Sequence, residues 1–227
     1  MAKGKPPVKV GNEVVLEIEN YASEGEGVAR INGFTVFVPG ALVGEKVVAS
    51  IDVVKKTYAR AHLLDEGIRF ASPERIEPPC PLYLDCGGCQ LLHQSYEGQL
   101  AMKQQRVIDA LSRIGGITDI TVHPIIGMTN PWHYRNKAQY PFGKSNGRII
   151  AGCYEKGTHR VVETPDCRIQ HPMNNLVVEG IRRLAEEFGL SVYDEETHKG
   201  LLRHVLVRRA FGTGEISVAL VTNDSHF

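Results

Sequence analysis

The chain has 227 residues, of which 42% are apolar and 23% are charged, and its formal net charge at neutral pH is zero. This composition is ordinary for a globular protein and excludes a disordered or fibrous chain. No secretory signal is recognisable at the start of the sequence, and no run approaches the ~18 apolar residues of a membrane span. We therefore expect a cytoplasmic protein with no membrane partner. In that compartment the five cysteines are metal ligands or buried thiols rather than disulfides.

The first part of the chain predicts a small β-barrel. Short apolar runs separated by turn residues occur throughout residues 8–66, and Asn32-Gly33 is a strong hairpin signal. Five strands are expected, at residues 14–18, 28–31, 34–38, 45–54 and 58–64. Five short, evenly spaced strands indicate an OB-like barrel, which we assign to a first domain of residues 1–70.

The remainder, residues 71–227, predicts a second, α+β domain, so the fold class is α+β. Residues 71–79 contain three prolines and cannot be helical. Helices are expected near residues 95–114 and 174–188. Strands connected by turns are expected between the two helices. A terminal hairpin is expected at residues 201–209 and 216–222.

The charge is unevenly distributed along this second domain. Residues 131–170 carry an excess of four basic residues, and residues 199–210 add four more with no acid. The segment between them, residues 171–198, carries an excess of four acidic residues. Such local basic segments are typical of a face that binds a polyanion, although strand surfaces paired with an acidic helix would give the same pattern.

Four cysteines form a candidate metal site. Cys80, Cys86 and Cys89 follow the spacing C-x5-C-x2-C, and Cys167 is the remote fourth member. One loop with three thiolates plus a distant thiolate is a common way to hold a cubane iron–sulfur cluster, and the glycines between Cys86 and Cys89 bring amide groups near the sulfurs. A zinc site is the alternative, with His93 or His171 as a substitute ligand. We interpret Cys153 as a small apolar residue in a strand.

These motifs resemble a known family. The segment GEGVARINGFTVFVPGALVGE, residues 25–45, resembles a TRAM domain, a small RNA-binding barrel. Together with the cysteine loop, the segment YRNK at residues 134–137, the block GCYEKGTHRVVETPDC at residues 152–167 and the segment GLLRHVLVR at residues 200–208, it resembles the S-adenosylmethionine-dependent RNA uracil-5 methyltransferases. The cysteines further resemble the members that act on 23S ribosomal RNA. The resemblance implies a [4Fe-4S] cluster and a ribosomal RNA partner.

Candidate RNA contacts lie in the first of the two basic segments. Arg135 and Lys137 are the expected contacts, because strand alternation places them on one face, next to the aromatic run Trp132 to Tyr134. We expect the protein to be a monomer.

The sequence contains no cofactor-binding turn. The family's catalytic thiolate, carboxylate and S-adenosylmethionine site belong to a Rossmann-like domain, and no strand, glycine-rich turn and helix in that order occurs before Phe227. We therefore expect the chain to be the RNA-recognition and iron–sulfur portion of such an enzyme, without catalytic residues or a methyltransferase domain, so that S-adenosylmethionine serves only the full-length enzyme. The alternatives are a zinc-stabilised RNA-binding module and a stand-alone iron–sulfur redox protein.

Overall fold

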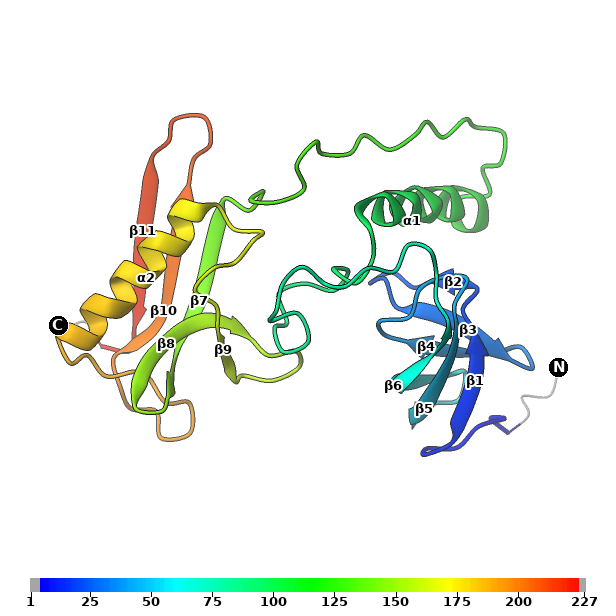
Figure 1. Cartoon of the computed structure of the whole chain (residues 1–227), viewed down its shortest axis with the longest axis horizontal. Helices are drawn as coiled ribbons and strands as arrows, with labels where there is room; N and C mark the ends of the chain where they lie inside the picture. The colour runs from blue at the N-terminus through cyan, green and yellow to red at the C-terminus, as the bar shows by residue number, and fades with distance from the viewer. Residues whose placement is uncertain (1–4, 225–227) are drawn as a thin grey trace. The chain divides into compact units, whose positions relative to one another are not determined.

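The computed structural model describes residues 5–224, which form two compact units (Figure 1). The barrel unit contains the residues up to Pro79 together with Gln90–Gly127, and the sheet unit contains Cys80–Cys89 together with the residues from Met128 onward. The chain thus passes from the barrel unit into the sheet unit for Cys80–Cys89, the cysteine loop, and then returns to the barrel unit. No helix in the described part of the chain is long and apolar enough to cross a membrane.

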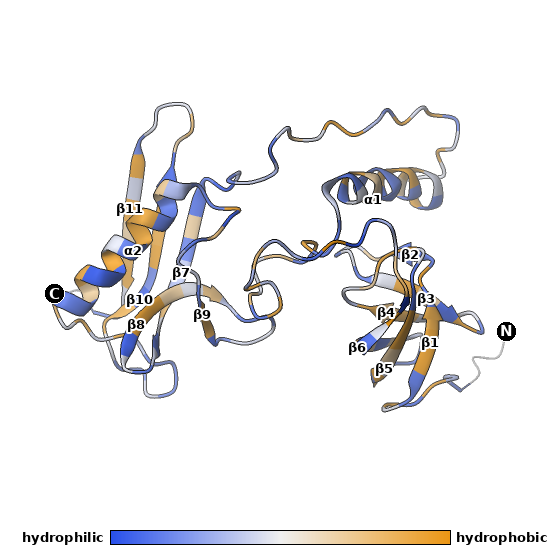
Figure 2. Ribbon diagram, viewed as in Figure 1, coloured by the Kyte–Doolittle hydropathy of each residue, from blue (hydrophilic) through white to orange (hydrophobic). Residues whose placement is uncertain are grey.

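The barrel unit is built on one sheet of six strands. These are β1 (Glu13–Glu17), β2 (Asn20–Tyr21), β3 (Gly27–Ile31), β4 (Phe34–Val38), β5 (Lys46–Val54) and β6 (Tyr58–Phe70), in the order β1-β5-β6-β4-β3-β2. All neighbours are antiparallel except β4 and β6, which are parallel. Inward-facing residues alternate along the strands and are fully enclosed, and Figure 2 shows the hydrophobic residues along them.

One continuous segment closes this sheet into a barrel. β1 pairs with β5 and β2 pairs with β3, and the residues between them bridge the two edges. Ile18 donates its N–H to the Glu45 carbonyl at 2.9 Å, and Glu19 donates to the Val28 carbonyl at 2.9 Å. The predicted count of five strands is corrected to six, because the prediction missed β2, which lies beyond the expected first strand at residues 14–18 and pairs with β3 over only two residues.

A helix follows the barrel in the sequence and belongs to the same unit. α1 spans Tyr96–Asp109 and continues into a π-helical turn, Ala110–Ile114, close to the predicted range. Ser95 caps it by accepting the N–H of Gly98 at 3.0 Å. The buried side chain is Met102, whereas Val107 is 48% and Ile114 88% exposed, so α1 does not bury the apolar stripe that its sequence suggests.

The sheet unit is an antiparallel sheet with one helix on a face. Its strands are β7 (Lys137–Ser145), β8 (Arg148–Tyr154), β9 (Val161–Glu163), β10 (Leu202–Arg209) and β11 (Ile216–Thr222), in the order β11-β10-β7-β8-β9. Helix α2 (Pro172–Glu187) packs on β7, β8 and β10 through Val178 and Ala185. Figure 2 shows α2 with hydrophobic residues on one side and hydrophilic residues on the other.

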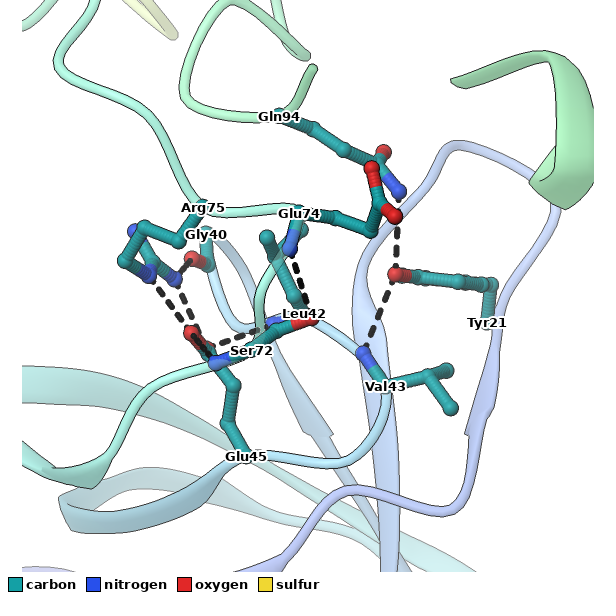
Figure 3. Close-up of polar contacts among 9 residues, drawn as sticks. All are labelled: Tyr21, Gly40, Leu42, Val43, Glu45, Ser72, Glu74, Arg75 and Gln94. Carbon is teal, nitrogen blue, oxygen red and sulfur yellow. Dashed lines mark hydrogen bonds and ion pairs between the residues drawn. The ribbon is translucent and has the colours of Figure 1, made fainter. Parts of the chain in front are cut away.

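A buried ion pair joins the barrel to the segment that follows it (Figure 3). The Glu45 side chain is 0% exposed and accepts two hydrogen bonds from the Arg75 guanidinium, at 2.6 and 2.7 Å. Its carboxylate also accepts the N–H groups of Leu42 and Ser72. Burial alone would raise the pKa of Glu45, but Arg75 and the two amides outweigh burial and lower it, so the carboxylate is charged in the folded protein.

The same contacts extend to the start of α1. Arg75 pairs with Gln94 in an antiparallel bridge, and Ser95 donates its N–H to the Glu74 carbonyl at 2.8 Å. The Tyr21 hydroxyl accepts the N–H of Val43 at 3.0 Å and the side-chain amide of Gln94 at 3.2 Å (Figure 3). Barrel, linker and helix entry are therefore held by one polar network.

Replacing Glu45 by glutamine should strongly destabilise the barrel unit. The substitution keeps the shape of the side chain but leaves the half-buried Arg75 without its counter-charge, which costs about 3–5 kcal/mol in buried pairs. The matched control is Glu17→Gln, because Glu17 pairs with Lys46 at 3.8 Å on the surface and such exposed pairs contribute less than about 1 kcal/mol. Urea unfolding of the complete chain measures both, and equal effects would contradict a structural role for the buried pair.

Lowering the pH should destabilise the protein over a pH range that is set by the pKa of His93. Burial, followed by repulsion from Arg75, lowers the pKa of His93 to about 4. Between the ordinary value of about 6.5 and pH 4, the unfolded chain binds a proton that the folded chain does not, so stability falls as the pH is lowered, by up to about 3 kcal/mol. His93→Gln should flatten the pH dependence of the unfolding midpoint, with the exposed His62→Gln as the control. An unchanged pH profile in His93→Gln would contradict this assignment.

Candidate functional site

The cysteine loop Cys80–Cys89 is attached to strand β8. Consecutive turns shape it, with the N–H of Cys86 bonded to the Leu82 carbonyl at 2.8 Å. The N–H of Gly87 then bonds to the Tyr154 carbonyl at 2.9 Å, directly after Cys153 on β8. A Cβ at Gly87 would lie 2.8 Å from that carbonyl oxygen, so only glycine allows this approach.

This attachment gathers the thiols in one region of the sheet unit. The Sγ atoms of Cys86 and Cys153 both lie 3.3 Å from the position that a Cβ of Gly88 would take. Cys89 interacts electrostatically with Cys167, Cys86 and Cys80. All five cysteines are free thiols of intermediate burial. The structure therefore brings together the four cysteines of the sequence prediction and adds Cys153, which does lie in a strand but whose thiol faces the loop.

The thiols have different acidities. A hydrogen bond with Cys153, assisted by the Gly88 N–H at 3.4 Å and the charge of Arg135, lowers the pKa of Cys86 to about 6 against the effect of burial. Burial and the neighbouring Cys167 raise the pKa of Cys89 to about 11. Crowded thiols thus oppose one another's ionisation, whereas a bound cation would favour the thiolate form of each.

A buried hydroxyl also faces the thiols. Tyr140 is 2% exposed, and its hydroxyl lies beside the Cys167 thiol, its hydrogen-bonding neighbour. Burial, followed by the Cys167 and Cys153 thiols beside it, raises the pKa of Tyr140, so the hydroxyl keeps its proton. A buried donor is costly unless an acceptor reaches it. A sulfur-rich group held by the cysteines would also supply such an acceptor.

The two metal groups considered from the sequence require different spacings of the sulfur atoms. Within residues 5–224, no three His, Cys, Asp or Glu side chains are arranged so that they could hold one metal ion. Zinc would require sulfurs about 3.8 Å apart, given Zn–S bonds of about 2.3 Å in a tetrahedron. In a cubane cluster each thiolate binds a different iron, so the sulfurs lie farther apart. The arrangement of the described side chains therefore shows neither group, and the cluster and the zinc site both stay predictions.

The two histidines proposed as substitute ligands have different surroundings. His171 is the N-cap of α2, where Nδ1 accepts the N–H of Met173 at 3.1 Å, and its ring also contacts Arg209. His93 belongs to the barrel unit, where it is 4% exposed.

The two predicted RNA contacts have different environments. Arg135 precedes β7 and is half-buried, with one guanidinium N–H bonded to the Gly88 carbonyl at 3.3 Å. Lys137 begins β7, is exposed, and pairs in register with Arg208 of β10. Of the aromatic run, His133 bonds to the Gln170 carbonyl at 2.8 Å, and Tyr134 is 48% exposed.

Some of the basic residues of the sheet unit form ion pairs with acidic side chains. Arg160 pairs with Glu155 at 2.5 Å, and Arg148 with Glu163 at 3.5 Å. In the described part of the chain, no ion pair involves Arg135, Lys137, Lys144, Arg168 or Arg208. The unpaired basic residues include both candidate RNA contacts.

Comparisons with known proteins agree with parts of this description. The TRAM domain family matches residues 7–64. A protein named an uncharacterized RNA methyltransferase from Halalkalibacterium halodurans is 47% identical over 98% of this chain and 48% of its own length. One of the same name from Clostridium tetani is 45% identical over 96% of this chain and 47% of its own length. The chain thus spans about half the length of the curated relatives it matches.

A solved structure shares the fold. The crystal structure of Pyrococcus abyssi tRNA (uracil-54, C5)-methyltransferase, in complex with S-adenosyl-L-homocysteine, matches with a TM-score of 0.68 and 23% identity. The match covers 93% of this chain and 46% of that chain.

These matches correct two predictions. We expected a fold that lacks the methyltransferase domain, and a chain that is only the non-catalytic portion of an enzyme, because no cofactor turn precedes Phe227. The similarity instead runs along 98% of the chain to a protein named as a methyltransferase, and along 93% to a methyltransferase structure. Where the sequence stops is no ground for calling the protein an inactive fragment. Residues 7–64 match the TRAM domain family, and nearly the whole chain is similar to proteins named as RNA methyltransferases.

Proposed function

We propose that this protein is an S-adenosylmethionine-dependent methyltransferase that acts on C5 of uracil in RNA. The similarity of nearly the whole chain to proteins named as RNA methyltransferases carries the proposal. The structural neighbour supports the cofactor and the base, since it is a uracil-C5 enzyme in complex with S-adenosyl-L-homocysteine. When bound, S-adenosylmethionine supplies the methyl group. A cytoplasmic location and a monomeric state belong to the same proposal.

The described residues serve RNA binding in this proposal. A TRAM domain at residues 7–64 and two unpaired cations of the sheet unit, Arg135 and Lys137, provide groups that can hold an RNA backbone. We assign phosphate contacts to Arg135 and Lys137. Ribosomal RNA, as the cysteine pattern suggests, is the proposed substrate, and transfer RNA, on which the structural neighbour acts, is the competing one.

The second part of the proposal is a [4Fe-4S] cluster on Cys80, Cys86, Cys89 and Cys167. Its support is the convergence of the loop thiols with Cys167, together with two donors that can stabilise cluster charge, the Gly88 N–H and the Tyr140 hydroxyl. Such a cluster would link the loop to the segment before α2 and so stabilise the sheet unit.

Metal analysis tests the cluster. Anaerobically purified protein should contain about four irons and four sulfides per chain, with a brown colour. Cys167→Ser should lose the iron and lower the melting temperature, whereas Cys153→Ser, the matched control on β8, should keep it. One zinc per chain would support the zinc-stabilised module instead, and protein without either metal would contradict both.

Labelled S-adenosylmethionine tests the activity. The protein at its natural length should transfer methyl groups to C5 of uracil in a 23S ribosomal RNA transcript, and not to transfer RNA. RNA affinity should fall with salt, and Arg135→Ala and Lys137→Ala should each reduce the salt slope by about one. Lys144→Ala, at the other end of β7, is the matched control. Methylation of transfer RNA alone would overturn the substrate, and no RNA binding would overturn the function.

A further inference from the structure

A hollow of about 460 Å³ opens at the start of β7, within the sheet unit. Its lining includes Tyr134, Arg135, Asn136, Lys137, Gln139 and Gln170, together with Tyr140 and Cys153, so the hollow adjoins the thiol site. The volume falls within the roughly 300–1,000 Å³ of sites for small molecules. The size therefore admits one small ligand or one unit of a polymer.

The backbone around the hollow is fixed. Arg135 donates its N–H to Ile169 at 2.9 Å and accepts that of His171, and the Asn136 carbonyl accepts the N–H of Arg209 at 2.8 Å. Gln170 is 1% exposed, and its amide bonds to the Lys137 carbonyl at 3.0 Å and to Asn174 at 3.1 Å. Side chains that project from this segment are therefore presented from a rigid support.

The projecting side chains are free to bind. Asn136, Lys137 and Gln139 are exposed, and their side chains make no hydrogen bond or ion pair with any described residue. Strand alternation explains the arrangement, since Ala138 and Tyr140 point inward and residues 137 and 139 point outward. Two amides, an ammonium and a phenol ring thus surround one hollow without partners of their own.

The chemistry of the lining selects the class of ligand. It contains two cations, Arg135 and Lys137, and no carboxylate, which favours an anion. The amides of Asn136 and Gln139 offer donors and acceptors together, as the edge of a nucleobase requires. Tyr134, 48% exposed, offers a ring face for stacking. A phosphate, a free base edge and a free base face occur together in a nucleotide whose base is unpaired, because a duplex pairs the edge and stacks the face while leaving the phosphate exposed.

We propose that this hollow binds a single unpaired nucleotide of the RNA substrate. Its phosphate lies at Lys137 and Arg135, its base edge at Asn136 and Gln139, and its base face at Tyr134. The inference rests on the proposed function in requiring RNA as the partner, and it deepens that function by locating a base-recognition site on β7.

Binding of short oligonucleotides tests the site. A labelled single-stranded uridine hexamer should bind the complete protein, and Tyr134→Ala should weaken it roughly tenfold through lost stacking. Gln139→Leu should also weaken it but leave the salt slope unchanged, whereas Lys137→Ala should reduce the slope by about one. The affinity for a duplex of equal length should be unchanged by Tyr134→Ala and by Gln139→Leu. Lys144→Ala is the control on the same strand.

Crosslinking adds a positional readout that does not depend on affinity. A hexamer containing 4-thiouridine should crosslink, on irradiation, to the peptide that contains residues 134–139. Crosslinks confined to the TRAM domain, or variants of Tyr134 and Gln139 that bind the hexamer as the unaltered protein does, would overturn the site while leaving RNA binding intact. Failure of the unaltered protein to bind either RNA would overturn the proposed function and this site with it.

Discussion

The buried ion pair between Glu45 and Arg75 is the constraint on which the barrel unit depends. A carboxylate with no solvent exposure is stable only when it is paired and hydrogen-bonded, and Glu45 accepts four hydrogen bonds from three residues. Arg75 lies in the segment after the barrel, so that segment cannot separate from the barrel without leaving a buried charge unpaired. Because residues 74–76 in turn pair with residues 93–95, the same charge also fixes the entry to α1.

In the sheet unit, the buried and uncharged side chain of Gln170 joins separate segments as the Glu45 carboxylate does in the barrel unit. Its amide holds the start of β7 and the first turn of α2, and the N–H of the same residue bonds to the Cys167 carbonyl at 3.0 Å. Asn175 reaches the Cys167 carbonyl as well, at 3.2 Å. Cys167 is therefore held in place by groups that need no metal, and the loop thiols are brought to it by the bond from Gly87 to Tyr154.

In the proposed function, the thiol site and the RNA site share one scaffold. Arg135 contacts the cysteine loop through the Gly88 carbonyl and also lines the hollow at the start of β7. A cluster that fixes the loop would consequently fix one wall of the nucleotide site. This connection gives the cluster a role in RNA recognition that requires no electron transfer.

Local patterns in the sequence predicted most of the secondary structure. The strand Phe34–Val38 and the strand Ile216–Thr222 have the predicted bounds, because turn residues flank alternating apolar residues there. Both helices lie close to their predicted ranges, since the cap Ser95 and the proline at the start of α2 are visible in the sequence. The four cysteines were chosen as candidate ligands from their spacing, and that choice stays a prediction because spacing does not assign a metal.

Only the tertiary structure revealed how these elements meet. The two-residue strand β2 arises from barrel closure, which no local pattern encodes. Cys153 has the sequence of an ordinary strand residue, and it joins the thiols only because Gly87 attaches the loop to β8. The burial of Glu45 beside Arg75, 30 residues away, is likewise invisible to a periodic pattern. The sequence by itself determined the local elements and the candidate ligands, whereas burial and long-range hydrogen bonds decided which side chains share a site, because those depend on atoms far apart in the chain.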